Sequence, residues 1–259
     1  MLDWTAACWA LAAIALLGLG GWAWSVARCD VSVVDGLWSL FFLLGAAVYA
    51  AIAGGAGARS ALVLALVAIW ALRLALHIAW RNRGEPEDRR YRAIRARNEP
   101  GFAWKSLYLV FGLQAMLAWA IAMPLFAAIS GGGPLGLLDA IGAALWLAGF
   151  AFETIGDAQL ARFKADPASR GRVLDTGLWR YTRHPNYFGE ALLWWGYFLI
   201  AAAGGGAWTV FAPALMTILL LRVSGVSLLE KDIGERRPAY REYVARTSAF
   251  VPWRPKEAA

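Results

Sequence analysis

The chain has 259 residues, of which 60% are hydrophobic and 17% are charged, and its mean hydropathy is +0.51. With 15 tryptophans in addition, this composition excludes ordinary soluble domains and indicates an integral membrane protein. The formal net charge of +7 comes from basic residues in the gaps between apolar segments, so no nucleic-acid partner is expected. Two cysteines, Cys8 and Cys29, are too few for a disulfide framework.

Apolar segments of bilayer length follow one another along the whole chain. About 18 or more apolar residues with few charges are enough to cross a bilayer. Seven such segments are predicted to be transmembrane helices: Trp4–Ala27, Val31–Ala53, Ala61–Trp80, Trp104–Ile129, Leu135–Ile155, Tyr187–Ala203 and Ala207–Val223. The first has no positively charged leading region and no A-x-A site, so we expect a retained span and not a cleaved signal.

The basic residues predict the orientation of these helices. Three gaps, Arg81–Ala103, Gly156–Asn186 and Arg222–Ala259, hold 21 of the 25 Lys and Arg residues. Because positively charged loops stay in the cytoplasm, the N-terminus is predicted outside and the C-terminus inside, in a bacterial inner membrane. The fold class predicted is an all-α, multi-pass integral membrane protein in which residues 1–259 form one seven-helix domain.

Two of the basic gaps are predicted to contain structure of their own. The segment Arg81–Ala103 mixes charges of both signs, which favours a turn followed by a short helix on the membrane surface. The tail after Arg222 includes Y-R-E-Y-V-A-R and is predicted to form an amphipathic segment under the bundle.

Ionisable side chains within the apolar segments are candidates for function, because lipid disfavours them. They are Asp35, Arg73, His77, Asp139, Glu153, Asp157, Glu190 and Arg222. With the predicted orientation, all but Asp139 fall toward the cytoplasmic third, where they could line a vestibule. Capping, snorkelling or ion pairs that hold the bundle together are the structural alternatives, for example Arg73 or His77 paired with Asp35 or Glu153. Two histidines are too few to indicate a metal site.

The densest polar motif is R-Y-T-R-H-P-N-Y-F-G-E, from Arg180 to Glu190. Pro185 suits the first turn of a helix, where its missing N–H is not needed. In such a helix Asn186 and Glu190 share one face, and the free N–H groups of the first turn favour an anion. The motif therefore predicts a phosphate- and amide-recognition edge at the membrane surface.

These residues also carry a resemblance to a known family. G-L-W-R-Y-T-R-H-P-N-Y-F-G-E (177–190), D-A-Q-L-A-R-F-K (157–164), N-R-G-E-P (82–86) and a tail with Tyr240, Tyr243 and Pro252 resemble the steroid 5-alpha-reductase family of integral membrane reductases. The resemblance covers the second to seventh apolar segments. The R-H-P-N-Y-F-G-E element is also similar to one in isoprenylcysteine carboxyl methyltransferases and in the larger sterol reductases.

The resemblance implies an NADPH-dependent oxidoreductase that reduces the carbon–carbon double bond of a 3-oxo-4-ene steroid or a similar lipophilic enone. It implies that residues 153–259 form the main cofactor-binding half and residues 31–80 the substrate-activating helices. The cofactor-binding positions that it implies are Asp157, Arg162, Lys164, Arg172, Tyr181, Arg183, Asn186, Glu190, Arg222 and Tyr240.

For the substrate carbonyl, the family uses an acid on the second span and a tyrosine on the third. Asp35 stands where the acid is expected, whereas Trp70 or Ala71 stands where the tyrosine is expected. Asp35, Arg73 and Trp70 are thus the predicted catalytic residues, with His77 as an alternative hydrogen-bond donor. Such a donor stabilises the negative charge that hydride addition builds on the carbonyl oxygen.

Two other functions remain open. A methyltransferase of the isoprenylcysteine type would use S-adenosylmethionine through the same C-terminal helices. A transporter or lipid-binding protein would place polar residues at the bilayer midplane or on both sides, whereas here they concentrate toward one side. The partners expected are the lipophilic substrate and membrane lipid, with no obligate protein partner.

Overall fold

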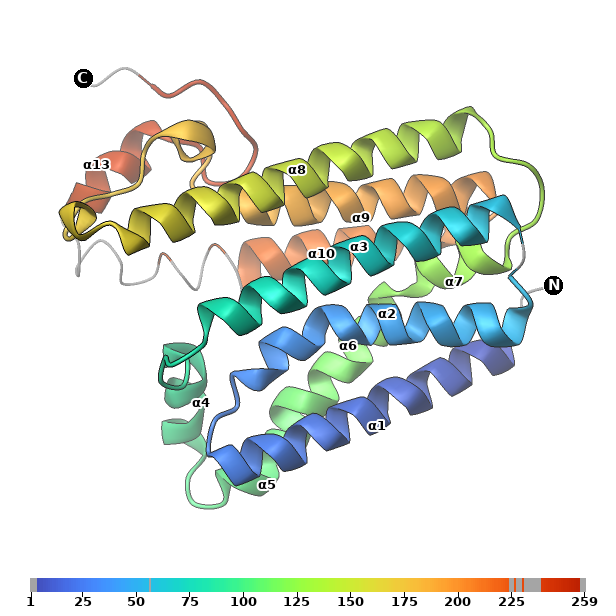
Figure 1. Ribbon diagram of the computed structural model, residues 1–259, viewed down its shortest axis with the longest axis horizontal. Helices are drawn as coiled ribbons and strands as arrows, with labels where there is room; N and C mark the ends of the chain where they lie inside the picture. Colours follow the sequence, from blue (N-terminus) through green and yellow to red (C-terminus); the bar gives the residue numbers. More distant parts are fainter. Residues whose placement is uncertain (1–3, 56, 224–225, 227–229, 231–238, 257–259) are drawn as a thin grey trace. The chain divides into compact units, whose positions relative to one another are not determined.

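The computed structural model describes residues 4–55, 57–223, 226, 230 and 239–256, and helices are the regular structure throughout this part of the chain (Figure 1). The α-helices are α1 (Trp4–Arg28), α2 (Val33–Ala53), α3 (Ala58–Arg81), α4 (Arg89–Asn98), α5 (Phe102–Ser106), α6 (Leu113–Ile121), α7 (Met123–Ser130), α8 (Leu137–Ala165), α9 (Pro185–Ala203), α10 (Phe211–Ile218) and α13 (Ala239–Arg246). The short 3-10 or π segments are η1 (Leu107–Gly112), η2 (Pro167–Ser169), η3 (Gly177–Arg180), η4 (Ala207–Val210) and η5 (Leu219–Val223). The predicted all-α class is confirmed for these residues.

Among the described residues, five helical stretches are long and apolar enough to cross a membrane. They are Trp4–Arg28, Val33–Ala53, Ala58–Arg81, Phe102–Ser130 and Leu137–Ala165. The other two predicted spans are also helical. However, α9 has 19 residues with Asn186 and Glu190 in its first turns, and the apolar stretch Ala207–Val223 is shorter than the five. The chain is thus an all-helical protein compatible with a multi-pass membrane protein.

Contacts divide the chain into two compact units. Unit 1 comprises Met1–Gly136 and Ile200–Thr209, and unit 2 comprises Leu137–Leu199 and Val210–Ala259. In unit 1, α2 packs against α1, α3, α6 and α7. The rings of Phe42 and Trp70 lie 5.6 Å apart between α2 and α3. Unit 1 is thus built around α2, which also carries Asp35 in its first turn.

In unit 2, α8 and α9 approach so closely that glycine is required where they touch. A Cβ atom on Gly149 would lie 2.5 Å from the carbonyl oxygen of Gly189, and one on Gly196 would lie 2.6 Å from that of Gly142. The glycines recur at seven-residue intervals on both helices, which is the spacing of one helix face. This close packing fixes the register of α8 against α9, and with it the positions of Asp157 and Asn186.

The two helices expected in the basic gaps are present. Asp88 caps the N-terminus of α4 by accepting a hydrogen bond from the Arg90 amide at 2.8 Å. In α13 the side chains of Tyr240 and Tyr243 are buried, while the charged side chains of Arg241, Glu242 and Arg246 are exposed. The amphipathic helix predicted for the tail is therefore confirmed within 239–246.

Candidate functional site

Asp35 is held by two neighbouring residues of α4. Its carboxylate accepts a hydrogen bond from Arg90 Nη2 at 2.6 Å and one from the Tyr91 hydroxyl at 2.5 Å. Arg90 is oriented in turn by Asp88, whose Oδ1 lies 3.0 Å from Arg90 Nε. The first turn of α2 and the first turn of α4 thus meet in a cluster of one carboxylate, one guanidinium and one phenol, called here the Asp35 cluster.

Hydrogen bonds around this cluster fasten α4 to the start of α2. Ser32 Oγ accepts from the Asp88 amide at 2.7 Å, and Glu87 Oε1 accepts from the Val31 amide at 2.9 Å. Glu87 is itself paired with Arg95 at 2.7 Å. One backbone amide from each segment takes part in these bonds. The distance between Asp35 and Tyr91 therefore depends on the main chain as well as on side-chain rotamers.

Tyr91 lies in an apolar environment. It is buried in a cluster with Val31, Val34, Phe102 and Phe111. Burial raises the pKa of the Tyr91 hydroxyl well above its ordinary value, and the neighbouring Asp35 carboxylate raises it further. Its oxygen accepts a hydrogen bond from Gln114 Nε2 at 3.3 Å. The phenol therefore keeps its proton across the physiological pH range and remains a hydrogen-bond donor.

The sequence analysis did not identify Tyr91. The resemblance implies a tyrosine on the third apolar segment, where this chain has Trp70 or Ala71, whereas the tyrosine that contacts Asp35 comes from the basic gap that follows. Tyr91 is the sole aromatic residue of residues 81–98, and an isolated aromatic residue among arginines is a signal for an anchor into the core. The sequence therefore contains a feature that could have identified Tyr91.

The other predicted catalytic residues lie on α3. Trp70 is fully buried, with its ring 5.6 Å from that of Phe42, so it packs in the core of unit 1. Arg73 and His77 are half-buried, and the His77 ring lies 6.0 Å from that of Trp80. The ion-pair partner of Asp35 is Arg90, from α4 and not from α3.

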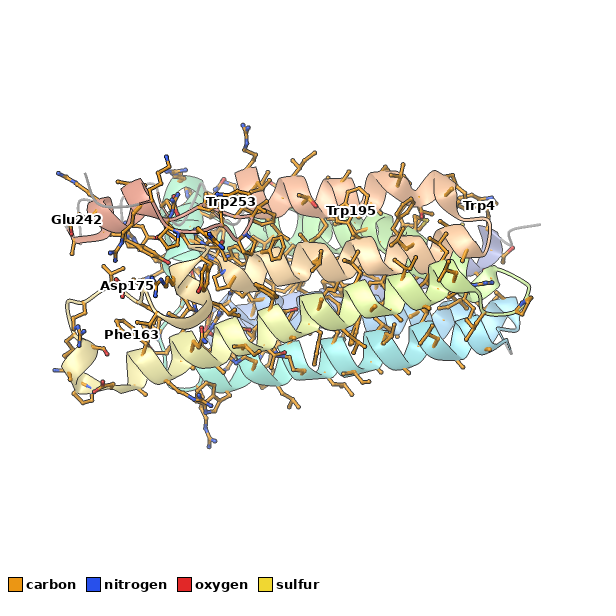
Figure 2. The ribbon with its side chains drawn as sticks, turned by 90° about the horizontal axis from the view of Figure 1, so that it is seen from above. Trp4, Phe163, Asp175, Trp195, Glu242 and Trp253 are labelled. Atoms are coloured by element: carbon orange, nitrogen blue, oxygen red, sulfur yellow. The ribbon has the colours of Figure 1, made fainter. Side chains whose placement is uncertain are left out.

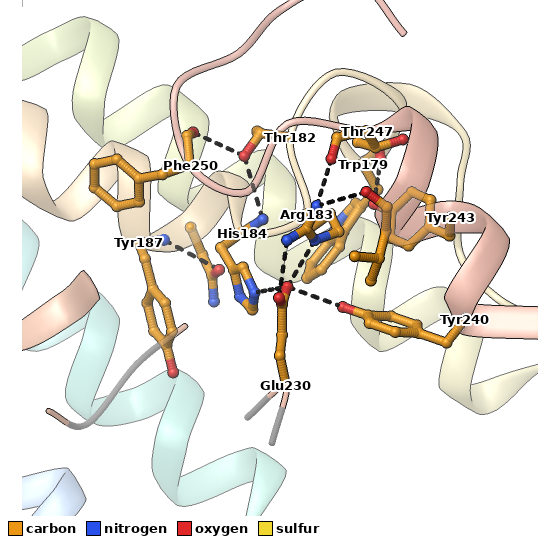
Figure 3. Close-up of polar contacts among 12 residues, drawn as sticks. Trp179, Thr182, Arg183, His184, Tyr187, Glu230, Tyr240, Tyr243, Thr247 and Phe250 are labelled. Atoms are coloured by element: carbon orange, nitrogen blue, oxygen red, sulfur yellow. Dashed lines mark hydrogen bonds and ion pairs between the residues drawn. The ribbon is translucent and has the colours of Figure 1, made fainter. Parts of the chain in front are cut away.

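Unit 2 contains a second carboxylate cluster, centred on Glu230 (Figure 3). Arg183 binds Glu230 through two nitrogens, with Nε 2.7 Å from Oε1 and Nη2 2.8 Å from Oε2. His184 Nε2 lies 2.9 Å from the same Oε1, and the Tyr240 hydroxyl donates to it at 3.5 Å. These four residues are called here the Glu230 clasp.

The clasp joins the segment before α9 to the C-terminal tail. The Arg183 Nη1 group donates to the carbonyl oxygens of Val244 at 3.1 Å and Thr247 at 2.5 Å. The Arg183 amide donates to Ser248 O at 2.9 Å. Thr182 Oγ1 donates to Phe250 O at 2.8 Å (Figure 3). Four of the five N–H donors of the Arg183 guanidinium are therefore used within the protein.

The charge state of Glu230 follows from these contacts. Partial burial alone would raise the pKa of its carboxyl group. The hydrogen bonds from His184 and Arg183, together with the charge on Arg183, outweigh burial and lower the pKa to about 2. Glu230 is therefore a carboxylate at any physiological pH. The sequence analysis did not identify this residue, because nothing in the local pattern marks it.

The predicted cofactor-binding residues, all in unit 2, fall into three groups. Asn186 Nδ2 donates to Asp157 Oδ1 at 3.1 Å, across the α8–α9 contact, and Glu190 is buried one turn further along α9. Arg183 and Tyr240 belong to the Glu230 clasp. The remaining members are exposed: Arg162, Lys164, Arg172, Tyr181 and Arg222. Within the described parts of the chain, no three His, Cys, Asp or Glu side chains are grouped as metal ligands.

The described part of the chain is thus helical, with membrane-length helices and two half-buried carboxylate clusters. Residues 21–247 match the family model described as a protein of unknown function (DUF1295), and since this range covers most of the chain, the protein belongs to that family.

The chain is also similar to the uncharacterized protein C594.04c of Schizosaccharomyces pombe. It is 28% identical over 272 residues, covering 92% of this chain and 77% of the relative. No solved structure matches the chain. Neither description names an activity, so function has to be argued from the residues themselves.

Proposed function

We propose that the protein is an NADPH-dependent membrane reductase that transfers a hydride to the carbon–carbon double bond of a 3-oxo-4-ene steroid or a similar lipophilic enone. The observation that carries the proposal is the contact between Tyr91 and Asp35. A buried, protonated phenol with a fixed position is the kind of donor that such a reaction requires at the substrate carbonyl.

The role of Tyr91 follows from where charge develops. Hydride addition to the β-carbon of an enone moves negative charge onto the carbonyl oxygen, and a proton then reaches the α-carbon. A hydrogen bond to that oxygen lowers the barrier most when the donor is already oriented and shielded from water. Tyr91 meets both conditions, because it is buried and because hydrogen bonds from backbone amides to the side chains of Glu87 and Ser32 join the segments before α4 and α2.

Asp35 acts in this proposal as the residue that positions Tyr91. Its carboxylate accepts the phenolic hydrogen bond, and Arg90 balances its charge. The Gln114 amide contacts the same phenolic oxygen. When a carbonyl oxygen replaces the carboxylate as acceptor, the phenol rotates about a single bond and no proton has to be transferred.

The residues of unit 2 fit a pyridine nucleotide in their chemistry. A bound NADPH would supply the hydride. The Asn186 side chain has both an amide donor and an acceptor, and Asp157 orients it. Arg162 and Arg222 are exposed cations suited to phosphate groups. Arg183 fits this role less well, because its donors are used in the Glu230 clasp.

We also propose a membrane topology. The protein has seven spans in a bacterial inner membrane, counting α9 and the stretch Ala207–Val223, with the N-terminus outside and the C-terminus in the cytoplasm. The basic gaps and the parity of the spans support this orientation. Substrate would then arrive from the lipid and nucleotide from the cytoplasm.

The experiment is a comparison of nucleotides with the purified protein. We expect NADPH consumption only when an enone steroid is added, and tighter binding of NADPH than of S-adenosylmethionine in a thermal-shift titration. Asp35→Ala should lower turnover with little change in NADPH affinity, because Asp35 positions the donor and not the nucleotide. If S-adenosylmethionine stabilises the protein and NADPH does not, the reductase proposal is overturned in favour of a methyltransferase.

A further inference from the structure

Unit 2 has a hollow beside η3. Its volume is about 760 Å³, and it lies between η3 and the C-terminal tail. The residues that line it are Asp175, Thr176, Gly177, Arg180, Tyr181, Arg246, Thr247, Arg254, Pro255 and Lys256. Figure 2 shows Asp175 and Glu242 of α13 gathered at the same end of unit 2 as Phe163 of α8. We call this hollow the tail pocket.

The tail pocket is strongly positive. Arg180, Arg246, Arg254 and Lys256 line it, against the single carboxylate of Asp175. That carboxylate is paired with Arg246. Three cations therefore remain for which no carboxylate of the pocket compensates. Gathered around a single concave surface, they attract an anion, because their fields add where low-dielectric walls exclude water.

The backbone of the pocket is ordered before any ligand arrives. The Trp253 amide donates to Tyr181 O at 2.9 Å, and the Lys256 amide donates to Arg246 O at 2.9 Å. The second bond also satisfies a carbonyl at the C-terminus of α13, which would otherwise repel an anion. The two bonds flank Arg254 on either side, so its position along the wall of the pocket is fixed by the main chain.

The tail segment that contributes lining residues also carries exposed apolar side chains. Val251 and Trp253 are 58% and 73% exposed, next in sequence to the basic residues Arg254 and Lys256. Exposed tryptophan beside clustered Lys and Arg is typical of segments that lie at the headgroup level of a membrane.

We propose that the tail pocket binds a phosphate group, carried by an anionic phospholipid headgroup at the membrane surface or by a free phosphate compound. Arg180 and Arg254 provide planar guanidinium groups that can donate two hydrogen bonds each to phosphate oxygens, and Lys256 adds a third charge. The site does not depend on the proposed reductase activity. It shares Tyr181 with the predicted nucleotide-binding residues, so its test avoids NADPH.

The test uses the full chain in nanodiscs of phosphatidylcholine and measures the midpoint of thermal unfolding. One arm adds inorganic pyrophosphate, with NaCl at equal ionic strength as the reference, and the other replaces part of the lipid by phosphatidylglycerol. The pocket variant is Arg254→Gln with Lys256→Gln. Its matched control is Arg83→Gln with Arg97→Gln, which removes the same charge from exposed positions of unit 1.

In at least one arm the wild type and the control should be stabilised by about 2 °C or more. The pocket variant should need about tenfold more of the phosphate compound for the same shift. A response to phosphatidylglycerol alone identifies a lipid headgroup, and a response to pyrophosphate identifies a free phosphate. The proposal fails if neither compound stabilises the wild type, or if the pocket variant and the control respond alike.

The pocket variant is expected to fold, because both side chains are exposed and the hydrogen bonds from Trp253 and Lys256 are donated by their backbone amides. Its unfolding midpoint without phosphate should equal that of the control. Arg180→Gln provides an independent reading from η3. It must weaken the same response, and an unchanged response would contradict the assignment of this pocket.

Discussion

The Asp35 cluster and the Glu230 clasp have the same components and different designs. Each contains a carboxylate, an arginine and a tyrosine. In the first, the tyrosine is the closest partner, with its hydroxyl 2.5 Å from the carboxylate. In the second, the tyrosine lies at 3.5 Å, and His184 and Arg183 occupy the near positions. The two carboxylates thus differ in whether a tyrosine donates to them at short range.

The two clusters also differ in what they connect. The Asp35 cluster joins the beginnings of two helices, and its phenol has an apolar environment. The Glu230 clasp joins Arg183 and His184 to Glu230 and to residues of the tail, through backbone carbonyls as well as side chains. We infer that the first is suited to a donor role and the second to holding the tail in place. Each prediction below tests this difference.

The largest effect is expected for Tyr91→Phe. Removing one oriented donor to a developing oxyanion costs about 100- to 1,000-fold in turnover. We therefore expect a loss of that order in NADPH-dependent enone reduction, with NADPH affinity changed little. Tyr108→Phe, at a tyrosine of unit 1 that is 61% exposed, is the control. A turnover of Tyr91→Phe within twofold of the wild type would remove Tyr91 from the reaction.

Glu230→Gln should affect the stability of the protein more than the hydrogen-bond donor Tyr91. It leaves the buried Arg183 guanidinium without its carboxylate, at a cost of about 1.5–3 kcal/mol. Unit 2 should unfold at a lower temperature, and the tail at 239–256 should be cleaved earlier in limited proteolysis. Glu242→Gln, at an exposed position of α13, removes the same charge and should behave as the wild type. Equal proteolysis of all three proteins would contradict the clasp.

The stability of the wild type and that of the Glu230→Gln variant should depend differently on pH. The Glu230 carboxyl has a pKa of about 2 in the folded protein against an ordinary value of 4.5. Its contribution is therefore complete above about pH 4.5 and is lost as the pH falls toward 2. The difference in unfolding midpoint between wild type and Glu230→Gln should be constant at neutral pH and should shrink on acidification. A constant difference down to pH 2 would exclude this carboxylate as the source.

The smallest effect is expected for Tyr240→Phe. Its hydroxyl lies 3.5 Å from Glu230, at the limit of a hydrogen bond, so its loss should cost less than about 0.5 kcal/mol. Tyr243→Phe is the comparison on the same helix, because that hydroxyl donates to the Trp179 carbonyl and its loss should cost about 1 kcal/mol. Unfolding midpoints of the two variants decide the order, and a reversed order would show that Tyr240 is the stronger attachment.

Much of the fold could be read from local pattern. Long apolar runs predict helices wherever they occur, and the start of α9 at Pro185 follows from the preference of proline for a first turn. The glycines of α8 and α9 were not recognised as a packing face, although their seven-residue spacing is visible in the sequence. The helices in the basic gaps were expected because Arg81–Ala103 mixes charges of both signs and because the tail has an amphipathic pattern.

The partners of the charged residues could not be read in the same way. Asp35 was expected to matter because a carboxylate within an apolar segment is costly, and that argument needs only the sequence. That Arg90 and Tyr91 complete it, more than fifty residues away, depends on where α4 folds back onto α2. Likewise, Arg183 is predicted from the sequence as a phosphate ligand, whereas in the structure its guanidinium is paired with Glu230. Hydropathy and helical periodicity predict secondary structure from residues within a few helical turns. Ion pairs form between side chains that the packing of the helices brings together, and these can be far apart in sequence.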